Sequence, residues 1–576
     1  MTEPITEWQM VDTHQDEPAL DTVSGADSDS QHGKQTIKLM IAGDSMTTGS
    51  EGDHTWRYRL WDWLRMTPGV QVEMVGPFTG TQAPQPAIGP QPPRFIDEPE
   101  DDNGPDLTGA YARDTHPDWP QQSRHFSQWG YRAAQCKDDI CDQVATYQPD
   151  YLLVALGFND MGWCVSDATG TLESMRGLVD NARRGKKDVK IVLATVPHRT
   201  FLRDELILWT DDYNMRIREL VDSLTSADSQ IKLAEFQHHY GCNRYLCPAG
   251  YDGLHPNALG EYQIAKAFSV ALQEFGLRQT TSSLVVPIRV PEPSSGEIKN
   301  LKAVGSAMGV RVTWDPVFGA RAYEVRNRVM DSGQPWNSDM VGAARFDTTF
   351  TGPGTRWEYM VRVTRGDAKE LKSPWSRVVD ATAKCNSAPG PKDIKVTATE
   401  KGCRVKWSAV EDWKVERYEI TVWDKDTPGA FIQCYGVRGT EVELKDLQIG
   451  HKYECWVGTW SEVDGELAGS DKAGARPFIP GGGRPNAPTG LQGVVDGDGA
   501  VKLSWKSQGK AAGYLVYKRR VSKEPLEFET DDEVVHETDR EVEIHPFIPS
   551  QFEFHVKAIN GELESKPSNT IMPSDE

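Results

Sequence analysis

Two stretches of this chain carry residue types that can act together in nucleophilic catalysis. Gly43, Asp44 and Ser45 end an apolar run, and a serine at a strand-to-helix turn can present its hydroxyl and its backbone N–H to one pocket. Asp252 and His255 stand three residues apart, just before a helical pattern. There the carboxylate can accept a hydrogen bond from one ring nitrogen of His255, which leaves the other nitrogen to take a hydroxyl proton.

Two further stretches supply groups that can stabilise negative charge. Asn159 lies in GFND (157–160), directly after an apolar run, and its side-chain amide can donate to an oxyanion. Gly130 lies in SQWGYRAAQ (127–135), where a glycine offers an unhindered backbone N–H. Taken alone, each stretch has an ordinary alternative as a turn or a helix cap. Taken together, the four stretches indicate acyl transfer.

The elements expected to position these stretches form an α/β domain. Apolar runs alternate with amphipathic helical patterns from residue 36 to about residue 280, which is typical of a parallel sheet covered by helices on both faces. In such a sheet, active residues gather outside the carboxyl ends of the strands. The predicted strands are 37–43, 70–76, 151–157, 189–196 and 231–236, and the predicted helices are 54–66, 131–147, 171–184, 203–224 and 257–275.

The order of the four stretches resembles a known family. The segment 36–280 resembles the SGNH hydrolases of the GDSL esterase/lipase superfamily, and the resemblance implies a flavodoxin-like three-layer sandwich with a five-stranded parallel sheet. The blocks that carry it are Gly43-Asp44-Ser45, Gly130, Gly157-x-Asn159-Asp160 and Asp252-x-x-His255-Pro256.

The resemblance also implies a role for each matched residue. Ser45 would be the nucleophile, His255 the general base, and Asp252 the carboxylate that orients His255. The oxyanion hole would combine the backbone N–H groups of Ser45 and Gly130 with the side chain of Asn159. These roles agree with what ester hydrolysis needs, namely an activated hydroxyl, a proton shuttle and preorganised donors.

Other residues are expected to shape the substrate site. Phe158, Trp163 and His198 follow strand ends and are candidates for lining a pocket. The long connection 79–128 is rich in Pro and Gly, and we expect it to cover or shape the pocket. The sequence contains no Gly-rich phosphate loop, and the reaction needs no metal, so neither a cofactor nor a metal is expected.

The rest of the chain repeats one all-β plan three times. Each copy has a tryptophan strand, a strand led by tyrosine and a strand with an aromatic–Glu pair, and Trp314, Trp407 and Trp505 recur at a period near one hundred. This pattern predicts tandem immunoglobulin-like β-sandwiches, which resemble fibronectin type III domains. The predicted organisation is an acidic disordered tail (1–35), the hydrolase-like domain (36–280), a linker (281–292) and three sandwiches (293–384, 388–480 and 485–573).

One feature of the fibronectin type III family differs among the three copies. The family has a corner tyrosine whose hydroxyl forms a hydrogen bond with nearby backbone. The middle copy has Tyr453 at this place, whereas the others have Trp357 and Phe552. The corner bond is therefore expected in the middle copy.

The nine cysteines indicate an oxidising compartment. Two C-x4-C pairs predict local disulfides, and a zinc site is the alternative. These pairs are Cys136/Cys141 and Cys242/Cys247. In the middle sandwich, alternation places Cys403 and Cys455 on inner faces, where a disulfide and two buried thiols fit nearly equally well. The odd count leaves one cysteine over, most simply Cys164.

Composition excludes some classes of partner. Acidic residues outnumber basic ones, 85 against 63, and the formal net charge is −22. Nucleic acids and anionic membranes would repel such a chain, so we expect no nucleic-acid partner. The sequence has no apolar run of 18 residues and predicts no transmembrane helix.

The expected function is a serine esterase that removes short acyl groups, such as acetyl, from carbohydrate. Fibronectin-type modules usually accompany extracellular enzymes that act on polymers, so an acylated polysaccharide is the expected substrate. A cell-wall or matrix polymer is the expected partner of the sandwiches. Alternatives are a lipase- or thioesterase-type acyl hydrolase, and a catalytically inactive matrix-binding protein. The expected location is extracellular, with the cytoplasm as the alternative because residues 1–35 lack the features of a secretory signal.

Overall fold

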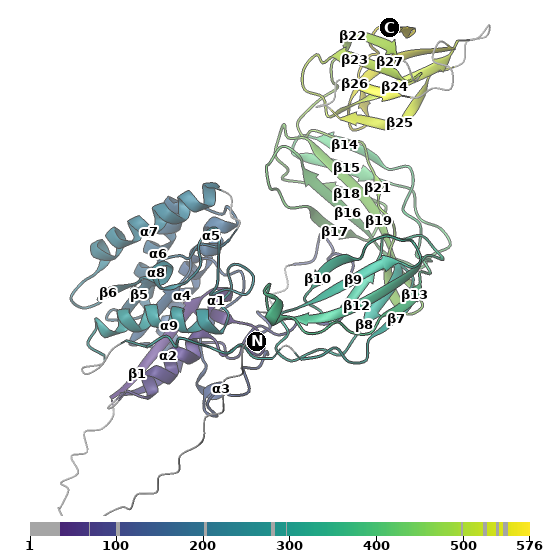
Figure 1. The fold of residues 1–576 in the computed structure, drawn as a ribbon. Coiled ribbons are helices and arrows are strands. Elements are labelled where there is room, and N and C mark those ends of the chain that lie inside the picture. Colours follow the sequence, from purple (N-terminus) through teal and green to yellow (C-terminus); the bar gives the residue numbers. More distant parts are fainter. Residues whose placement is uncertain are drawn as a thin grey trace, which may run out of the picture.

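An α/β domain and three β-sandwiches make up the chain, and the third sandwich lies farthest from the α/β domain (Figure 1). The predicted tail lies outside the described residues, apart from Gln35, which begins the first strand. The computed structural model describes residues 35–67, 70–99, 104–200, 204–277, 283–294, 296–496, 499–521, 527–536, 541–544 and 551–575.

A parallel sheet with the strand order β2-β1-β4-β5-β6 forms the centre of the α/β domain. This is the order of a flavodoxin-like sheet, and it confirms the predicted fold class. A short additional strand, β3, pairs with the end of β1 and has no counterpart in the sequence prediction. The strands are β1 (Gln35–Gly43), β2 (Val70–Val75), β3 (Phe126–Ser127), β4 (Tyr151–Ala155), β5 (Lys190–Ala194) and β6 (Ile231–Ala234).

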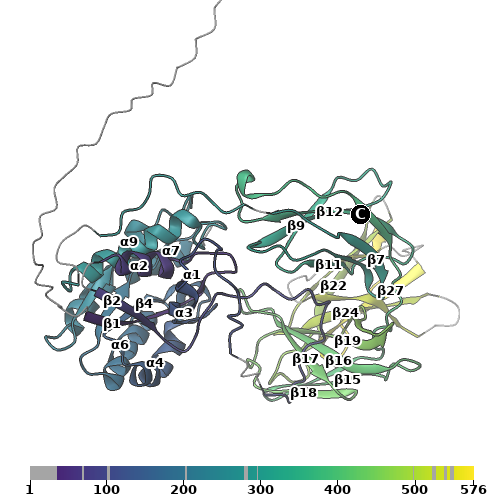
Figure 2. The same cartoon turned by 90° about the horizontal axis from the view of Figure 1, so that it is seen from below.

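Helices cover both faces of this sheet (Figure 2). Side chains alternate along a strand, so Leu39 and Ile41 of β1 join the core beneath α2 and α9, while Met40 and Ala42 join the core beneath α4, α6 and α7. The helices are α1 (Ser45–Thr48), α2 (Trp56–Arg65), α3 (Trp119–Gln122), α4 (Ala133–Tyr147), α5 (Phe158–Gly162), α6 (Ala168–Gly185), α7 (Asp204–Leu224), α8 (Phe236–His239) and α9 (Ala258–Gln273). None of the helices in the described part of the chain combines the length and apolarity needed to cross a bilayer.

Each sandwich packs two antiparallel sheets around a core that contains its tryptophan. The first has β11-β8-β7 against β10-β9-β12-β13, formed by β7 (Lys302–Ser306), β8 (Gly309–Thr313), β9 (Ala322–Val329), β10 (Asn337–Val341), β11 (Arg345–Thr348), β12 (Arg356–Thr364), η1 (Lys369–Leu371) and β13 (Val379–Thr382). The second has β14-β15-β18 against β17-β16-β19-β20, formed by β14 (Lys395–Thr399), β15 (Gly402–Lys406), β16 (Val415–Asp424), β17 (Gln433–Val437), β18 (Glu441–Leu444), β19 (Tyr453–Val463), β20 (Glu466–Gly469) and β21 (Ala473–Gly474).

The third sandwich follows the same plan, with β26-β23-β22 against β25-β24-β27-β28 and β29 beside β22. In all three copies the tryptophan meets the leading tyrosine edge to face, which is a favourable aromatic geometry. The pairs are Trp314–Tyr323, Trp407–Tyr418 and Trp505–Tyr514, with ring centroids 5.1, 5.4 and 5.3 Å apart. The strands are β22 (Thr489–Val495), β23 (Val501–Lys506), β24 (Gly513–Arg520), β25 (Glu529–His536), β26 (Glu541–Ile544), β27 (Phe552–Asn560), β28 (Leu563–Glu564) and β29 (Ser574–Asp575).

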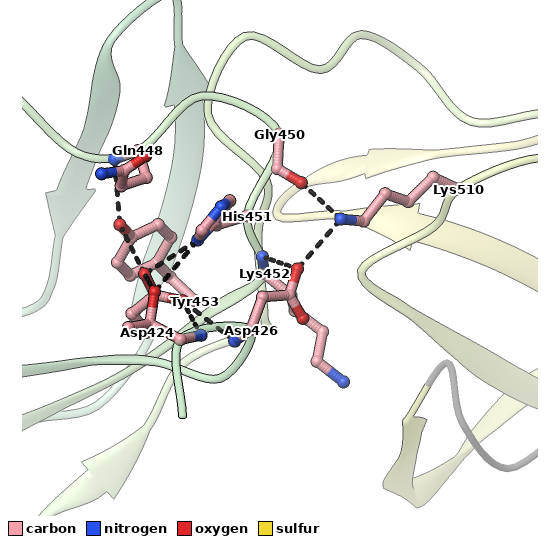
Figure 3. A network of polar contacts seen from close by, with 9 residues as sticks. Asp424, Asp426, Gln448, Gly450, His451, Lys452, Tyr453 and Lys510 are labelled. Carbon is pink, nitrogen blue, oxygen red and sulfur yellow. Dashed lines mark hydrogen bonds and ion pairs between the residues drawn. The ribbon is translucent and has the colours of Figure 1, made fainter. Parts of the chain in front are cut away.

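The corner tyrosine prediction is confirmed in the second sandwich. The Tyr453 hydroxyl accepts a hydrogen bond from the backbone N–H of Gln448 at 2.9 Å (Figure 3). In the first sandwich Trp357 stands in this place and donates its indole N–H to the Thr351 hydroxyl at 2.8 Å. A different polar contact therefore ties the same corner there.

The connection 79–128 reaches the second sandwich rather than lying wholly over the α/β domain. Its backbone pairs with β17, where Ile96 N–H donates to Gly436 O at 3.0 Å. The guanidinium groups of Arg417 and Arg438 lie 3.8 and 3.6 Å from the ring centroid of Phe95. The predicted covering segment thus also ties the α/β domain to a sandwich.

The second and third sandwiches meet through backbone groups, the buried amide of Asn560 and ion pairs that include Arg476–Glu564. The side chain of Asn560 accepts from Ile479 N–H at 2.7 Å and donates to Gly482 O at 2.9 Å. At the edge of this junction, Lys510 donates to Asp426 at 2.9 Å (Figure 3).

The cysteine predictions have mixed outcomes. Cys242 and Cys247 form the predicted disulfide. The predicted Cys136–Cys141 disulfide is wrong, because both thiols are free. Both residues lie on α4, where about 100° of rotation per residue turns positions five apart to different sides of the helix. Of the two alternatives for Cys403 and Cys455, the structure has two buried thiols.

Candidate active site

The turn after β1 presents Ser45 at the first position of α1. Asp44 caps this short helix by accepting from Met46 N–H at 3.0 Å. A Cβ on Gly43 would lie 2.1 Å from the Thr47 hydroxyl oxygen, so only glycine fits where the strand enters the turn. The fully buried Arg57 holds the far side of the turn by donating to Thr47 O at 2.8 Å. The turn is therefore fixed from both sides.

A continuous hydrogen-bonded chain runs from Ser45 to Asp252. The Ser45 hydroxyl lies 2.9 Å from His255 Nε2, and His255 Nδ1 lies 2.7 Å from Asp252 Oδ2. The other Asp252 oxygen accepts from the backbone N–H groups of His255 at 2.8 Å and Leu254 at 3.1 Å. This arrangement places the His255 Nδ1 proton on the Asp252 side and leaves Nε2 to accept from Ser45.

The environment of Asp252 keeps it ionised. Burial opposes its ionisation, but the hydrogen bonds from the His255 ring and from the His255 and Leu254 backbone outweigh burial and lower its pKa to about 2. Asp44 has the opposite balance, since burial raises its pKa to about 7 despite the hydrogen bond from Met46 N–H. Asp252 is thus the carboxylate that carries negative charge beside the imidazole.

Two aromatic rings flank His255. The Trp129 indole stacks on the imidazole with a centroid distance of 5.1 Å and an interplanar angle of 13°, and Tyr251 lies at 5.7 Å and 21°. The Trp129 indole N–H donates to Gly49 O at 3.1 Å, in the loop that follows α1. The hydrogen bonds of His255 alone do not fix the tilt of its ring, and the two flanking rings limit that tilt.

The loops after β1, β3 and β4 meet beside Ser45. Gly43 pairs with Ser127 of β3 and with Ala155 of β4, so the stretches that follow these strands emerge at one edge of the sheet. This edge lies at the point where the strand order reverses, where ligands bind in open α/β sheets. The sequence places Gly130 and Asn159 in these same loops.

Asn159 and Asp160 bind the segment that contains Gly130. The Asn159 amide donates to Tyr131 O at 3.1 Å. Asp160 accepts from the backbone N–H groups of Ala133 at 2.8 Å and Ala134 at 2.9 Å, at the start of α4. These contacts tie Asn159 and Asp160 to the segment that directly follows Gly130.

Gly130 adopts a conformation that favours glycine, with φ of 75°. A Cβ at this position would lie 2.7 Å from the Trp163 ring. Trp163 itself is 52% exposed. The backbone angle therefore favours glycine at this position, and any larger residue would also have to displace the Trp163 indole.

The other two pocket candidates lie differently. Phe158 is partly buried and packs against both cores of the α/β domain, and it lines a small cavity with Asp44. His198 forms a hydrogen bond with Asp211 at 2.9 Å. Trp163 thus contacts the predicted oxyanion segment directly, whereas no contact links His198 to Ser45 within the described residues.

Sequence reasoning missed Trp129, Tyr251 and Arg57 as site residues. Trp129 and Tyr251 stand inside the motif stretches themselves, so their positions were visible, but stacking on His255 depends on the fold. Arg57 had no distinguishing signal, because Arg59, Asp62 and Arg65 lie in the same helical pattern. In the described part of the chain no group of three His, Cys, Asp or Glu residues is placed to hold a metal ion.

Residues 96–262 match the GDSL-like lipase/acylhydrolase family, and residues 387–469 match the fibronectin type III domain. The chain carries a GDSL-like acylhydrolase domain. The matched range of this domain includes Gly130, Asn159 and the Asp252–His255 pair, while Ser45 precedes it. The fold brings the serine of the GDSL-like domain to the matched residues.

Solved structures similar to the chain include esterases and fibronectin-type domains. A mutant acetyl esterase with acetate ion has a TM-score of 0.32 at 18% identity, covering 42% of this chain and 97% of that one. A carbohydrate esterase of family 3 from Talaromyces cellulolyticus has a TM-score of 0.31 at 19% identity, covering 42% of this chain and 100% of that one. The chicken CNTN1 FN1-FN3 domains have a TM-score of 0.17 at 14% identity, covering 48% of this chain and 98% of that one. A comparison with curated proteins gives no match.

Proposed function

We propose that the GDSL-like domain is a serine ester hydrolase that works through an acyl-Ser45 intermediate. The observation that carries the proposal is the hydrogen-bonded chain Ser45–His255–Asp252, with distances of 2.9 and 2.7 Å. The ionised Asp252 supports it, because a carboxylate beside Nδ1 stabilises the imidazolium that forms when His255 takes a proton.

In the proposed reaction, Ser45 Oγ attacks the ester carbonyl carbon while its proton passes to His255 Nε2. The carbonyl oxygen gains negative charge, and the donors offered to it are the backbone N–H groups of Ser45 and Gly130 and the side chain of Asn159. His255 then gives its proton to the leaving alcohol, and the acyl group stays on Ser45. A water molecule, deprotonated by His255, releases the carboxylic acid and restores the serine.

We propose a short acyl group on carbohydrate as the substrate. Two indoles support this choice, since Trp129 and Trp163 are 41% and 52% exposed beside the site and offer flat apolar faces of the kind that line ligand sites. We also propose an extracellular location, which the Cys242–Cys247 disulfide supports. The third sandwich, farthest from Ser45, is the module proposed to contact a cell-wall or matrix polymer.

The test measures p-nitrophenyl acetate hydrolysis by the wild type and by Ser45→Ala. We expect kcat/KM of the variant to fall at least about 1000-fold, since removing the nucleophile leaves only binding and oxyanion contacts. Equal rates in the two proteins would end the proposal.

A second comparison tests the acyl group. Acetyl esters should be hydrolysed faster than octanoyl esters by the same enzyme. A preference for octanoyl esters would overturn the carbohydrate-acetyl assignment while leaving the serine mechanism intact.

A further inference from the structure

The loop that carries His255 is in contact with the first sandwich as well as with its own domain. The backbone N–H of Asp367, in the sandwich loop after β12, donates to Tyr251 O at 2.9 Å. On the other side of the loop, the Tyr240 hydroxyl donates to Leu254 O at 2.5 Å. The segment from Tyr251 to His255 is therefore held from both domains.

A side chain of the sandwich lies on the ring that flanks the catalytic histidine. The Arg321 guanidinium carbon lies 4.0 Å from the ring centroid of Tyr251, a distance at which a cation and an aromatic face attract each other. Tyr251 in turn lies at 21° to the His255 imidazole. A stack of Arg321, Tyr251 and His255 thus crosses the domain boundary.

Buried charge fixes Arg321 in this place. Its guanidinium donates to Asp53 at 2.9 Å, and the two side chains are only 4% and 5% exposed. Asp53 also accepts from the backbone N–H of Ser50 at 2.9 Å, in the loop that follows α1. Arg365 of the same sandwich approaches Asp53 to 3.7 Å. The pair therefore links the sandwich to the loop beside Ser45.

The backbones of the two domains also approach each other closely. A Cβ at Gly52, whose φ is 84°, would lie 2.5 Å from the Cα of Gly319. Beside this contact, Arg113 of the α/β domain stacks on Phe318 at 4.6 Å. The two loops meet with no room for a side chain between them.

We propose that Arg321 is a positioning residue for His255, acting through Tyr251, and that the first sandwich is part of the catalytic unit. This inference rests on the proposed serine hydrolase function. Arg321 touches neither the reacting atoms nor His255 itself. Its effect is to hold the Tyr251 ring, and with it the imidazole, at the angle that keeps Nε2 in line with the Ser45 hydroxyl.

The test measures kcat and KM for p-nitrophenyl acetate in Arg321→Ala, with Arg328→Ala as a matched control. Arg328 lies in the same sandwich, stacks on Trp336 at 4.4 Å and pairs with Glu358, away from the GDSL-like domain. Misplacement of a catalytic group typically costs about 10- to 100-fold in rate. We therefore expect kcat of Arg321→Ala to fall by about that factor with KM within about 2-fold of wild type, and Arg328→Ala to keep wild-type values.

Conservative variants separate positioning from folding. Arg321→Lys keeps a cation for Asp53 and should recover several-fold of the lost kcat. Tyr251→Phe keeps the ring and should stay near wild type, whereas Tyr251→Leu should lose kcat as Arg321→Ala does. Because both side chains act along one path, the double variant Arg321→Ala/Tyr251→Leu should be no slower than its slower parent. Circular dichroism melts establish that each variant is folded at the assay temperature.

The outcomes distinguish the two proposals. If Ser45→Ala is as active as wild type, the proposed function fails. If Ser45→Ala is inactive while Arg321→Ala keeps wild-type kcat, the positioning role of Arg321 is wrong and the serine mechanism stands. The positioning role of Arg321 through Tyr251 would also be wrong if the kcat losses of the two single variants multiplied in the double variant.

Discussion

The two junctions at either end of the sandwich array differ in chemistry and in what they touch. Where the first sandwich meets the GDSL-like domain, charged side chains are buried, with Asp53 and Arg321 5% and 4% exposed. Where the third sandwich meets the second, the neutral amide of Asn560 is buried and the charged pairs are partly exposed, Arg476–Glu564 at 27% and 24% and Lys510–Asp426 at 50% and 35%. The first junction reaches the loop that carries His255, whereas the third sandwich lies far from the GDSL-like domain (Figure 1). Similar modules in one chain thus form junctions of different chemistry.

The largest difference between the junctions should appear when one charged side chain is removed from each. Asp53→Ala leaves Arg321 and Arg365 buried without their partner, which typically costs about 3–5 kcal/mol. We expect the free energy of unfolding of the affected transition to fall by about that amount in urea titrations, together with kcat.

The matched change at the second junction is Lys510→Ala, which breaks a solvent-exposed pair. It should alter the free energy of unfolding by less than about 1 kcal/mol and leave kcat unchanged. If Asp53→Ala and Lys510→Ala lowered the free energy of unfolding by similar amounts, the proposed difference between the buried and the exposed junction would be wrong.

The pH dependence of stability should also separate the junctions. Burial raises the pKa of Glu261, which lies on α9 beside Arg59 and feels the charges of Asp53 and Arg321 at the first junction, to about 7. Its stabilising contribution is complete below the unfolded-state pKa, near 4.5, and is lost as the pH rises through the raised folded-state pKa. Melting temperatures measured from pH 5 to pH 8 should therefore fall more in the wild type than in Glu261→Gln.

At the second junction the pH dependence of stability has the opposite sign. Burial opposes the ionisation of Asp426, but the hydrogen bond from Lys510 and that from Lys452 N–H outweigh it and lower its pKa. Its contribution is lost only as the pH falls below about 4. Asp426→Asn should therefore match the wild type between pH 5 and pH 8 in the slope of melting temperature. A flat wild-type profile, parallel to Glu261→Gln, would contradict the titration of Glu261.

An effect between those of Asp53→Ala and Lys510→Ala is expected for the buried amide of the second junction. Asn560→Ala leaves Ile479 N–H without its acceptor, at a typical cost of about 1–3 kcal/mol. We expect a lower melting temperature for the third sandwich with kcat and KM unchanged, measured by calorimetry and ester hydrolysis. A fall in kcat would mean that the second junction also influences the active site.

Much of the fold could be predicted because it rests on local pattern. The five long strands are continuous apolar runs, and the tryptophan–tyrosine spacing marks each sandwich core. The juxtaposition of Ser45 with His255 followed from the rule that active residues gather at the carboxyl ends of parallel strands. The two-residue strand β3 escaped prediction because it lies within an irregular connection and has no period of its own.

The missing parts of the site depend on contacts between distant segments. Arg321 lies 70 residues beyond Tyr251 in the sequence and in another domain, and nothing in its local pattern marks it as a partner of an aromatic ring. The Cys136–Cys141 prediction failed for a different reason, since the predicted helix 131–147 contains both cysteines and a helix turns residues five apart to different sides. Regular elements can thus be predicted from the sequence, while the packing between them cannot.

The most direct test of the central claim, that Ser45 and the first sandwich form one catalytic unit, is covalent labelling with a fluorophosphonate followed by peptide mass spectrometry. The adduct should form on Ser45 of the wild type. Its rate of formation should fall in Arg321→Ala by about the same factor as kcat, and should not change in Asn560→Ala. An adduct on a different serine, or equal labelling rates in wild type and Arg321→Ala, would contradict the claim.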